Sequence, residues 1–323
     1  MMARILALVA AVGLVAGAVV LRGALGQDDD GDGDTPAGVI WCDPLLAEAC
    51  NAAAEGAEVE LIEPGEAFTR LSDPGAESAA PPPSTWVTVG DWPAILATAT
   101  SSANGEVATF GDPTPLASSP LVLAGNAANL ERLTAECAEV SWGCLADVAD
   151  QDADQLTGGA GLGPFRLGHV VPPTSTGLFT LEALVATIPD GGAPSRTDVE
   201  SQAFAGLLDR IDSGEFTGDT ARAADQFLAR PGEASVFVGP EALLDPKLGA
   251  RDATLLPVAP TATLTAQLAP LTDVDGVGTS PSGSAPAGQL AGWGRRPTTA
   301  PTGLLAALTP EAPLTPMRSL ETT

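Results

Sequence analysis

The sequence has few of the groups that perform acid–base or nucleophilic chemistry. It contains no Tyr, one His (His169) and one Lys (Lys247) among 323 residues. Because these residue types supply many catalytic acids, bases and nucleophiles, their scarcity argues against an enzyme. His169 has no second His or Cys ligand set for a metal, and the Gly-x-Ser-x-Gly motif of serine hydrolases is absent. We therefore predict a protein that is not an enzyme and has no metal or cofactor.

Positive charge is also scarce. The chain has 14 Lys and Arg against 41 Asp and Glu, a formal net charge of -27. Such a chain repels phosphate backbones and offers no basic stripe for counterion release, which excludes nucleic acid as a partner. Its 45% hydrophobic content is nevertheless enough for a sizeable core.

The first 36 residues are not typical of a folded domain, and the remainder has the length of roughly two domains. Arg4 precedes an apolar run from Ile5 to Leu21, which is the layout of a signal peptide, but the run is also long enough for a membrane anchor. Residues 1–26 are thus a signal peptide or an N-terminal membrane anchor, and residues 27–36 are an acidic spacer. Both alternatives place the protein on the extracellular face of the cell membrane, secreted or anchored.

The four cysteines agree with export. Cys42 and Cys50 are eight positions apart, and Cys137 and Cys144 are seven apart. Neither spacing is that of a zinc knuckle, and disulfides are typical of exported proteins. Four cysteines allow three connectivities; the short spacings favour the two local pairs, and crossed pairs remain open.

Predicted strands and helices alternate along the chain after Pro36, which favours an α/β protein with largely parallel sheets. Predicted strands include 39–41, 59–62, 86–89, 121–124, 165–170, 236–238, 255–258 and 263–268. Predicted helices include 44–54, 67–71, 92–98, 127–137, 145–149, 175–187, 198–211, 220–228, 241–244, 285–293 and 303–308.

Six segments, in this order, resemble parts of the type II extracellular solute-binding proteins of ABC importers, in particular an actinobacterial branch similar to molybdate- and sulfate-binding proteins. The segments are Val39–Cys42, Ser84–Trp92, Leu116–Ala124, Arg166–Gly177, Ser235–Glu241 and Ala291–Pro297. The resemblance implies a two-lobed, periplasmic-binding-protein-like fold whose lobes are joined by two crossover segments. We expect lobe one to comprise residues 37–117 and 258–323, and lobe two residues 118–257.

The resemblance also implies a function. We expect the protein to capture a small solute, such as an oxyanion, between its lobes and to deliver it to an ABC permease. The alternative is an envelope-anchored interaction protein that keeps the fold but has lost transport. This alternative is suggested by Val171 or Pro172, which stands where the family usually has Asp, and by the loop Val89–Trp92, which lacks the family's serines.

The expected ligand site joins the matching segments to a helix start. Thr174, Ser175 and Thr176 precede or open a predicted helix, where hydroxyls and free backbone N–H groups favour an anion. The same residues can also be read as ordinary helix caps. The full set of predicted ligand residues is Ser119, Thr174, Ser175, Thr176, Gly90, Asp91, Gly239 and Glu241.

Overall fold

The fold is that of a computed structural model, which describes residues 39–54, 57–72, 83–100, 109–152, 156, 163–189, 194–249 and 253–272. The segments predicted as signal peptide or anchor, acidic spacer and the helices at 285–293 and 303–308 lie outside these residues. Within the described part of the chain, no helix has both the length and the hydropathy needed to cross a bilayer.

Ten strands form one mixed sheet in the order β2-β1-β3-β10-β5-β8-β6-β7, with β4 paired to β10 and β9 paired to β5. Strands β1, β2 and β3 are parallel to one another, as are β6, β7 and β8, whereas β10 and β5 are antiparallel to their neighbours. The sheet is therefore mixed rather than largely parallel. The strands are β1 Val39–Cys42, β2 Glu58–Leu61, β3 Thr85–Val89, β4 Thr109–Phe110, β5 Thr114–Gly125, β6 Leu167–Val170, β7 Glu215–Phe216, β8 Val236–Pro240, β9 Thr254–Pro257 and β10 Thr263–Thr272.

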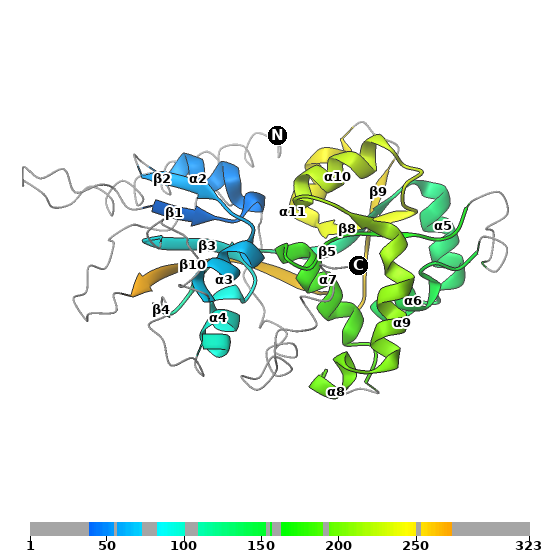
Figure 1. Cartoon of the computed structure of the whole chain (residues 1–323). Helices are drawn as coiled ribbons and strands as arrows, with labels where there is room; N and C mark the ends of the chain where they lie inside the picture. The colour runs from blue at the N-terminus through cyan, green and yellow to red at the C-terminus, as the bar shows by residue number, and fades with distance from the viewer. Residues whose placement is uncertain are drawn as a thin grey trace, which may run out of the picture.

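The helices gather in two groups, which Figure 1 shows on the left and right of the molecule. The first lobe contains β1 to β4 with η1, α2, α3 and α4, and the second lobe contains β6 to β9 with helices α5 to α11. The helices are η1 Pro44–Leu46, α2 Ala47–Ala53, α3 Pro64–Ser72, α4 Trp92–Thr100, α5 Ala127–Glu136, α6 Trp142–Val148, α7 Ser175–Val185, α8 Arg196–Val199, α9 Gln202–Ile211, η3 Asp212–Gly214, α10 Thr220–Ala229 and α11 Glu241–Leu248.

Two crossovers join the lobes. The first half of β5 pairs with β10 up to Pro120, and its second half pairs with β8 and β9 from Leu121 onward. The chain returns through residues 258–262, which connect β9 in the second lobe to β10 beside the first lobe. The crossover architecture that the sequence predicts is thus present, while the exact lobe boundaries stay a prediction.

Hydrophobic packing is continuous between the lobes. One buried cluster includes Val87 and Val89 of β3 together with Val236 and Val238 of β8. A second cluster, between the first-lobe sheet and α3 and α4, also contains Leu178 of α7 from the second lobe. Apolar burial therefore contributes to holding the lobes together as well as to each lobe's own core.

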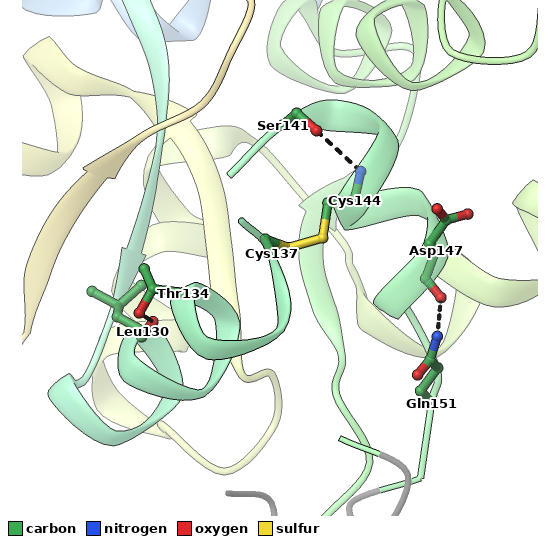
Figure 2. The surroundings of a disulfide bond; sticks show 7 residues. All are labelled: Leu130, Thr134, Cys137, Ser141, Cys144, Asp147 and Gln151. Carbon is green, nitrogen blue, oxygen red and sulfur yellow. Dashed lines mark hydrogen bonds between the residues drawn. A yellow bond between two sulfur atoms is a disulfide. The ribbon is translucent and has the colours of Figure 1, made fainter. Parts of the chain in front are cut away.

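Both local disulfides are formed. Cys42 pairs with Cys50 and Cys137 with Cys144, with Cα–Cα distances of 6.5 and 6.0 Å. The first links the end of β1 to α2, and the second joins α6 to the residue that follows α5 (Figure 2). This is the pairing that the spacing favours.

Candidate functional site

The turn from β6 into α7 begins the candidate site. Thr174 is the N-cap of α7, where its Oγ1 accepts a hydrogen bond of 3.0 Å from the N–H of Gly177 and donates one of 2.8 Å to the carbonyl of Val171. A Cβ on Gly177 would lie 2.0 Å from the Val171 oxygen, so only glycine lets the helix approach the strand end this closely. Thr174 is buried and serves first as a cap.

Ser175 reaches across to the first lobe. Its Oγ lies 2.8 Å from Oδ2 of Asp43 and 2.6 Å from the carbonyl oxygen of Val89. A hydroxyl has a single hydrogen to donate, so an ionised Asp43 competes with Val89 for it. When Asp43 is protonated, its own O–H can donate to Ser175, which then donates to Val89. With Asp43 neutral, the Ser175 hydroxyl and the Val89 carbonyl both have a partner.

Asp43 follows β1 and caps η1. Its Oδ1 accepts a hydrogen bond of 2.9 Å from the N–H of Leu45, and the residue is 1% exposed. Burial raises the pKa of Asp43 from 3.8 to about 6, although hydrogen bonds from Leu45, Ser175 and Val89 act in the opposite direction. A buried carboxyl of the first lobe thus lies at the start of α7, where the sequence predicts the solute.

Two more carboxylates lie near Asp43. Glu63 directly precedes α3, and Asp219 caps α10 by accepting a hydrogen bond of 2.8 Å from the N–H of Arg222. The pKa of Glu63 is raised from 4.5 to about 8, first by burial and then by the negative charges of Asp43, Asp219 and Glu66. All the charges that act on Glu63 are negative, so this junction between the lobes disfavours further negative charge.

Two glycines allow the lobes to touch. The N–H of Gly65 in α3 donates a hydrogen bond of 2.9 Å to the carbonyl of Pro173, and a Cβ on Gly65 would lie 2.8 Å from that oxygen. Gly90 has φ +89°, and a Cβ there would lie 2.2 Å from the ring of Phe179 in α7. Figure 1 shows α7 on the side of the second lobe that faces α3. We call this region, formed by Asp43, Glu63, Gly65, Gly90, Pro173, Thr174, Ser175, Phe179 and Asp219, the lobe junction.

The structure brings Thr174, Ser175 and Gly90 into this junction. Asp91, next to Gly90, is half-buried, and burial raises its pKa. Thr176 is fully buried, and its Oγ1 has no hydrogen-bond partner among the described residues.

The other predicted ligand residues surround the start of α11. Ser119 lies within β5, where its Oγ accepts a hydrogen bond of 3.0 Å from the N–H of Ala242. Gly239 lies in β8, opposite Val122 of β5, and Glu241 is the exposed first residue of α11. No described hydrogen bond joins this group to the β6–α7 turn. That the two groups of residues form one binding site stays a prediction.

Three residues of the junction, Asp43, Glu63 and Asp219, were not predicted from the sequence. Each is an acid that stands just before a helix. Asp43 comes directly after β1, and Ile62 alone separates Glu63 from β2. The ends of parallel strands are where α/β sheets place ligand-binding loops, so an acid at a strand-to-helix boundary is the signal that could have found them. Within the described residues, no group of three or more His, Cys, Asp and Glu is arranged to hold a metal ion.

Comparison with known proteins identifies the fold. No family model and no curated protein matches the sequence. The periplasmic binding protein AfuA from Actinobacillus pleuropneumoniae, solved with fructose-6-phosphate bound, is 15% identical with a TM-score of 0.50, over 79% of this chain and 82% of that one. Iron-bound HitA from Pseudomonas aeruginosa is 13% identical with a TM-score of 0.49, over 88% and 97% of the two chains. With two crossovers and a mixed sheet, the chain has the two-lobed α/β fold of the periplasmic binding proteins.

Proposed function

We propose that the protein is a solute-binding protein, which captures a small solute between its two lobes and delivers it to an ABC importer. The observation that carries this proposal is the lobe junction. There the starts of η1 and α3, from the first lobe, lie close to the starts of α7 and α10, from the second lobe, and both lobes contribute polar groups. A solute held there contacts both lobes at once, so its binding free energy favours the closed arrangement. Thr176, whose buried hydroxyl has no partner among the described residues, follows Ser175 in the first turn of α7.

The charge of the junction favours a neutral or amino-bearing solute over an oxyanion. Asp43, Glu63 and Asp219 interact unfavourably with one another. Two unit charges 4 Å apart interact by about 4 kcal/mol at an effective dielectric constant of 20, so a free oxyanion would add a substantial penalty, whereas an ammonium group would relieve it. The molybdate- or sulfate-binding branch that the sequence resembles would require a solute site away from these carboxylates.

The proposed location is outside the cytoplasm. Two disulfides join all four cysteines, which is typical of proteins folded in an oxidising compartment. Delivery to a permease at the outer face of the membrane requires the same location. Peptide mapping of the protein from its native cells would show whether residues 1–26 are removed or retained as an anchor.

A specific observation favours the second candidate, an envelope-anchored interaction protein that no longer binds a solute. The hydroxyls of Ser119, Thr174 and Ser175 all have partners within the chain, and Asp43 lies where the solute is expected. For a solute to reach Ser175, the Asp43–Ser175 hydrogen bond must break.

A thermal-shift screen separates the two candidates. The panel contains amino acids, polyamines and quaternary amines, neutral sugars, and the oxyanions molybdate, tungstate, sulfate and phosphate. A solute at 100 times its Kd stabilises the native state by about 2.7 kcal/mol, which corresponds to a rise in Tm of roughly 4 °C for a chain of 323 residues. We expect an amine or a neutral solute to give such a shift. Calorimetry should then show a binding stoichiometry of one solute per chain. No shift with any compound would contradict solute capture and favour the interaction protein.

A further inference from the structure

The second crossover is held by hydrogen bonds to the loop between α5 and α6 of the second lobe. Residues 258–262 run from the end of β9 to the start of β10, and the carbonyl of Ala262 accepts a hydrogen bond of 2.8 Å from the N–H of Leu121 in the first crossover. Every change in the angle between the lobes must bend these two crossover segments, since they connect the two lobes. Groups that hold residues 258–262 therefore restrain lobe movement.

Three hydrogen bonds attach the loop between α5 and α6 to this segment. The N–H of Ala259 donates to the carbonyl of Val140 at 2.9 Å, and the N–H of Trp142 donates to the carbonyl of Ala259 at 3.1 Å. The indole Nε1 of Trp142 donates to the carbonyl of Pro260 at 2.9 Å. The Trp142 side chain is 1% exposed, whereas Val140 and Ala259 are half-buried and Pro260 is exposed. Ser141 and Ala259 also form a parallel β-bridge.

The disulfide between Cys137 and Cys144 closes this loop. Cys137 follows α5 and Cys144 lies in the first turn of α6 (Figure 2). Val140 and Trp142, which bind the crossover, therefore stand between the two bridged cysteines in the chain. Ser141 caps α6 by accepting a hydrogen bond of 3.3 Å from the N–H of Cys144. The disulfide limits the conformations of Val140 and Trp142 when they release Ala259, so re-formation of the three bonds is favoured.

We propose that the disulfide-closed loop from Cys137 to Cys144 is a clamp on the crossover at residues 258–262, which limits how often the lobes separate. The restraint on the lobes does not depend on a solute. Its consequence for solute capture, a slower release, rests on the function proposed above. The second disulfide, between Cys42 and Cys50, links β1 to α2 and forms no described hydrogen bond to residues 258–262, so it provides a matched control.

Two backbone amides report separately on the clamp and on lobe separation. The amide of Ala259 is protected by Val140, and the amide of Gly65 is protected by Pro173 of the opposite lobe. Hydrogen exchange of each amide measures how often its bond opens. The experiment measures both amides by NMR in the full chain without a solute. Amides in the middle of α9 and α10 serve as references for global unfolding.

We expect the Cys137→Ser/Cys144→Ser double variant to exchange the Ala259 and Gly65 amides about ten times faster or more, with the reference amides unchanged. The Cys42→Ser/Cys50→Ser variant should leave the Ala259 amide at its wild-type rate. Trp142→Phe keeps both disulfides and the ring but removes the bond to Pro260, so we expect a smaller acceleration, roughly threefold, at Ala259. This variant provides the test if the first fails to fold.

Three outcomes would overturn the clamp. The first is an Ala259 amide that exchanges at the wild-type rate in both the Cys137→Ser/Cys144→Ser and Trp142→Phe variants. The second is equal acceleration at Ala259 in the two disulfide variants. The third is acceleration at Ala259 while Gly65 is unchanged, which would show that the loop does not limit lobe separation. Because the exchange experiment uses no solute, a result that overturns the clamp would not contradict solute capture. The thermal-shift screen tests solute capture separately.

Discussion

Asp43 and Ser175 are 132 positions apart in the chain, yet the Asp43 Oδ2 and the Ser175 Oγ form a buried hydrogen bond of 2.8 Å between the two lobes. The Asp43 carboxyl is 1% exposed and has a raised pKa, and the Ser175 hydroxyl is equally buried. The protonation state of Asp43 in the first lobe therefore affects how strongly this lobe is bound to the second.

The coupling predicts an unusual effect for Asp43→Asn. An asparagine can accept from Leu45 and donate to Ser175, which then donates to Val89, so it reproduces the protonated carboxyl. Burial raises the Asp43 pKa from 3.8 to about 6, a difference of about two pH units that corresponds to roughly 3 kcal/mol of lost stability once the group is ionised. We expect Asp43→Asn to increase the free energy of unfolding at pH 8 by about 1 to 3 kcal/mol.

The same substitution should change the pH dependence. The native state holds the Asp43 proton more tightly than the unfolded state does, so stability is highest below pH 4 for this group and falls as the pH rises from about 4 to 6. Urea unfolding at pH 4, 5, 6, 7 and 8 measures how the free energy of unfolding depends on pH. The control is Glu131→Gln on the exposed side of α5. An Asp43→Asn protein that is less stable than wild type at pH 8 would contradict the assignment.

Removal of the Ser175 hydroxyl should weaken the junction. Ser175→Ala leaves the Val89 carbonyl and Asp43 Oδ2 without the donor they share, and an unsatisfied buried acceptor costs about 1 to 3 kcal/mol. Chemical denaturation at pH 7 measures the loss. The matched control is Ser213→Ala, whose exposed hydroxyl bonds Asp150 at 3.3 Å and for which we expect a change below about 0.5 kcal/mol. Equal effects in the two variants would show that the Ser175 contact does not hold the lobes.

A methyl group at Gly65 should separate the lobes. Its Cβ would lie within 2.9 Å of three atoms of Pro173, two of them backbone atoms that can yield only by moving the β6–α7 turn. We expect Gly65→Ala to destabilise the protein by about 1 to 3 kcal/mol, as is typical for overpacking. Gly232→Ala is the control, because a Cβ there meets nothing within 4 Å. Thermal unfolding of both variants decides the point; a Gly65→Ala protein as stable as Gly232→Ala would show that the contact with Pro173 is easily relaxed.

The sequence predicts the strand and helix order well because most elements are bounded by clear signals, such as Asn126 before α5 and Asp219 before α10. It predicts only residues 121–124 of β5, whereas the strand runs from Thr114 to Gly125. Proline lacks an N–H for the sheet, so Pro115 and Pro120 argue against a central strand. In the structure, Pro120 lies where β5 changes partners from β10 to β8 and β9.

The predicted helix at 198–211 is two helices, because the Ser201 hydroxyl accepts a hydrogen bond from the N–H of Phe204 and starts α9 there. Strands β4 and β7 have two residues each, too few for any periodicity to show. The junction was harder to predict than the elements. Asp43, Glu63 and Asp219 are separated widely in the chain, and each resembles an ordinary residue before a helix. Only the tertiary fold shows that they lie close together, that Asp219 raises the pKa of Asp43, and that Asp43 and Asp219 raise the pKa of Glu63.

The pH dependence of solute binding should reveal the sign of the solute's charge. Glu63 has a pKa of about 8, so it is mostly protonated at pH 6 and mostly ionised at pH 9. An amino-bearing solute that stays cationic over this range binds the ionised carboxylate better, so its affinity should rise between pH 6 and pH 9. Glu63→Gln should reduce this rise to the part that comes from Asp43, which is about half ionised at pH 6. It should weaken binding at pH 9 by about ten- to a hundredfold, equivalent to about 1.5 to 3 kcal/mol for a hydrogen bond to a charged group. Calorimetry with one amine from the screen measures the affinity, and Glu131→Gln should leave the affinity unchanged.

An oxyanion would behave in the opposite way. Its affinity would fall as the pH rises, and Glu63→Gln would increase it. That result would place an anion at the junction and exclude the amine.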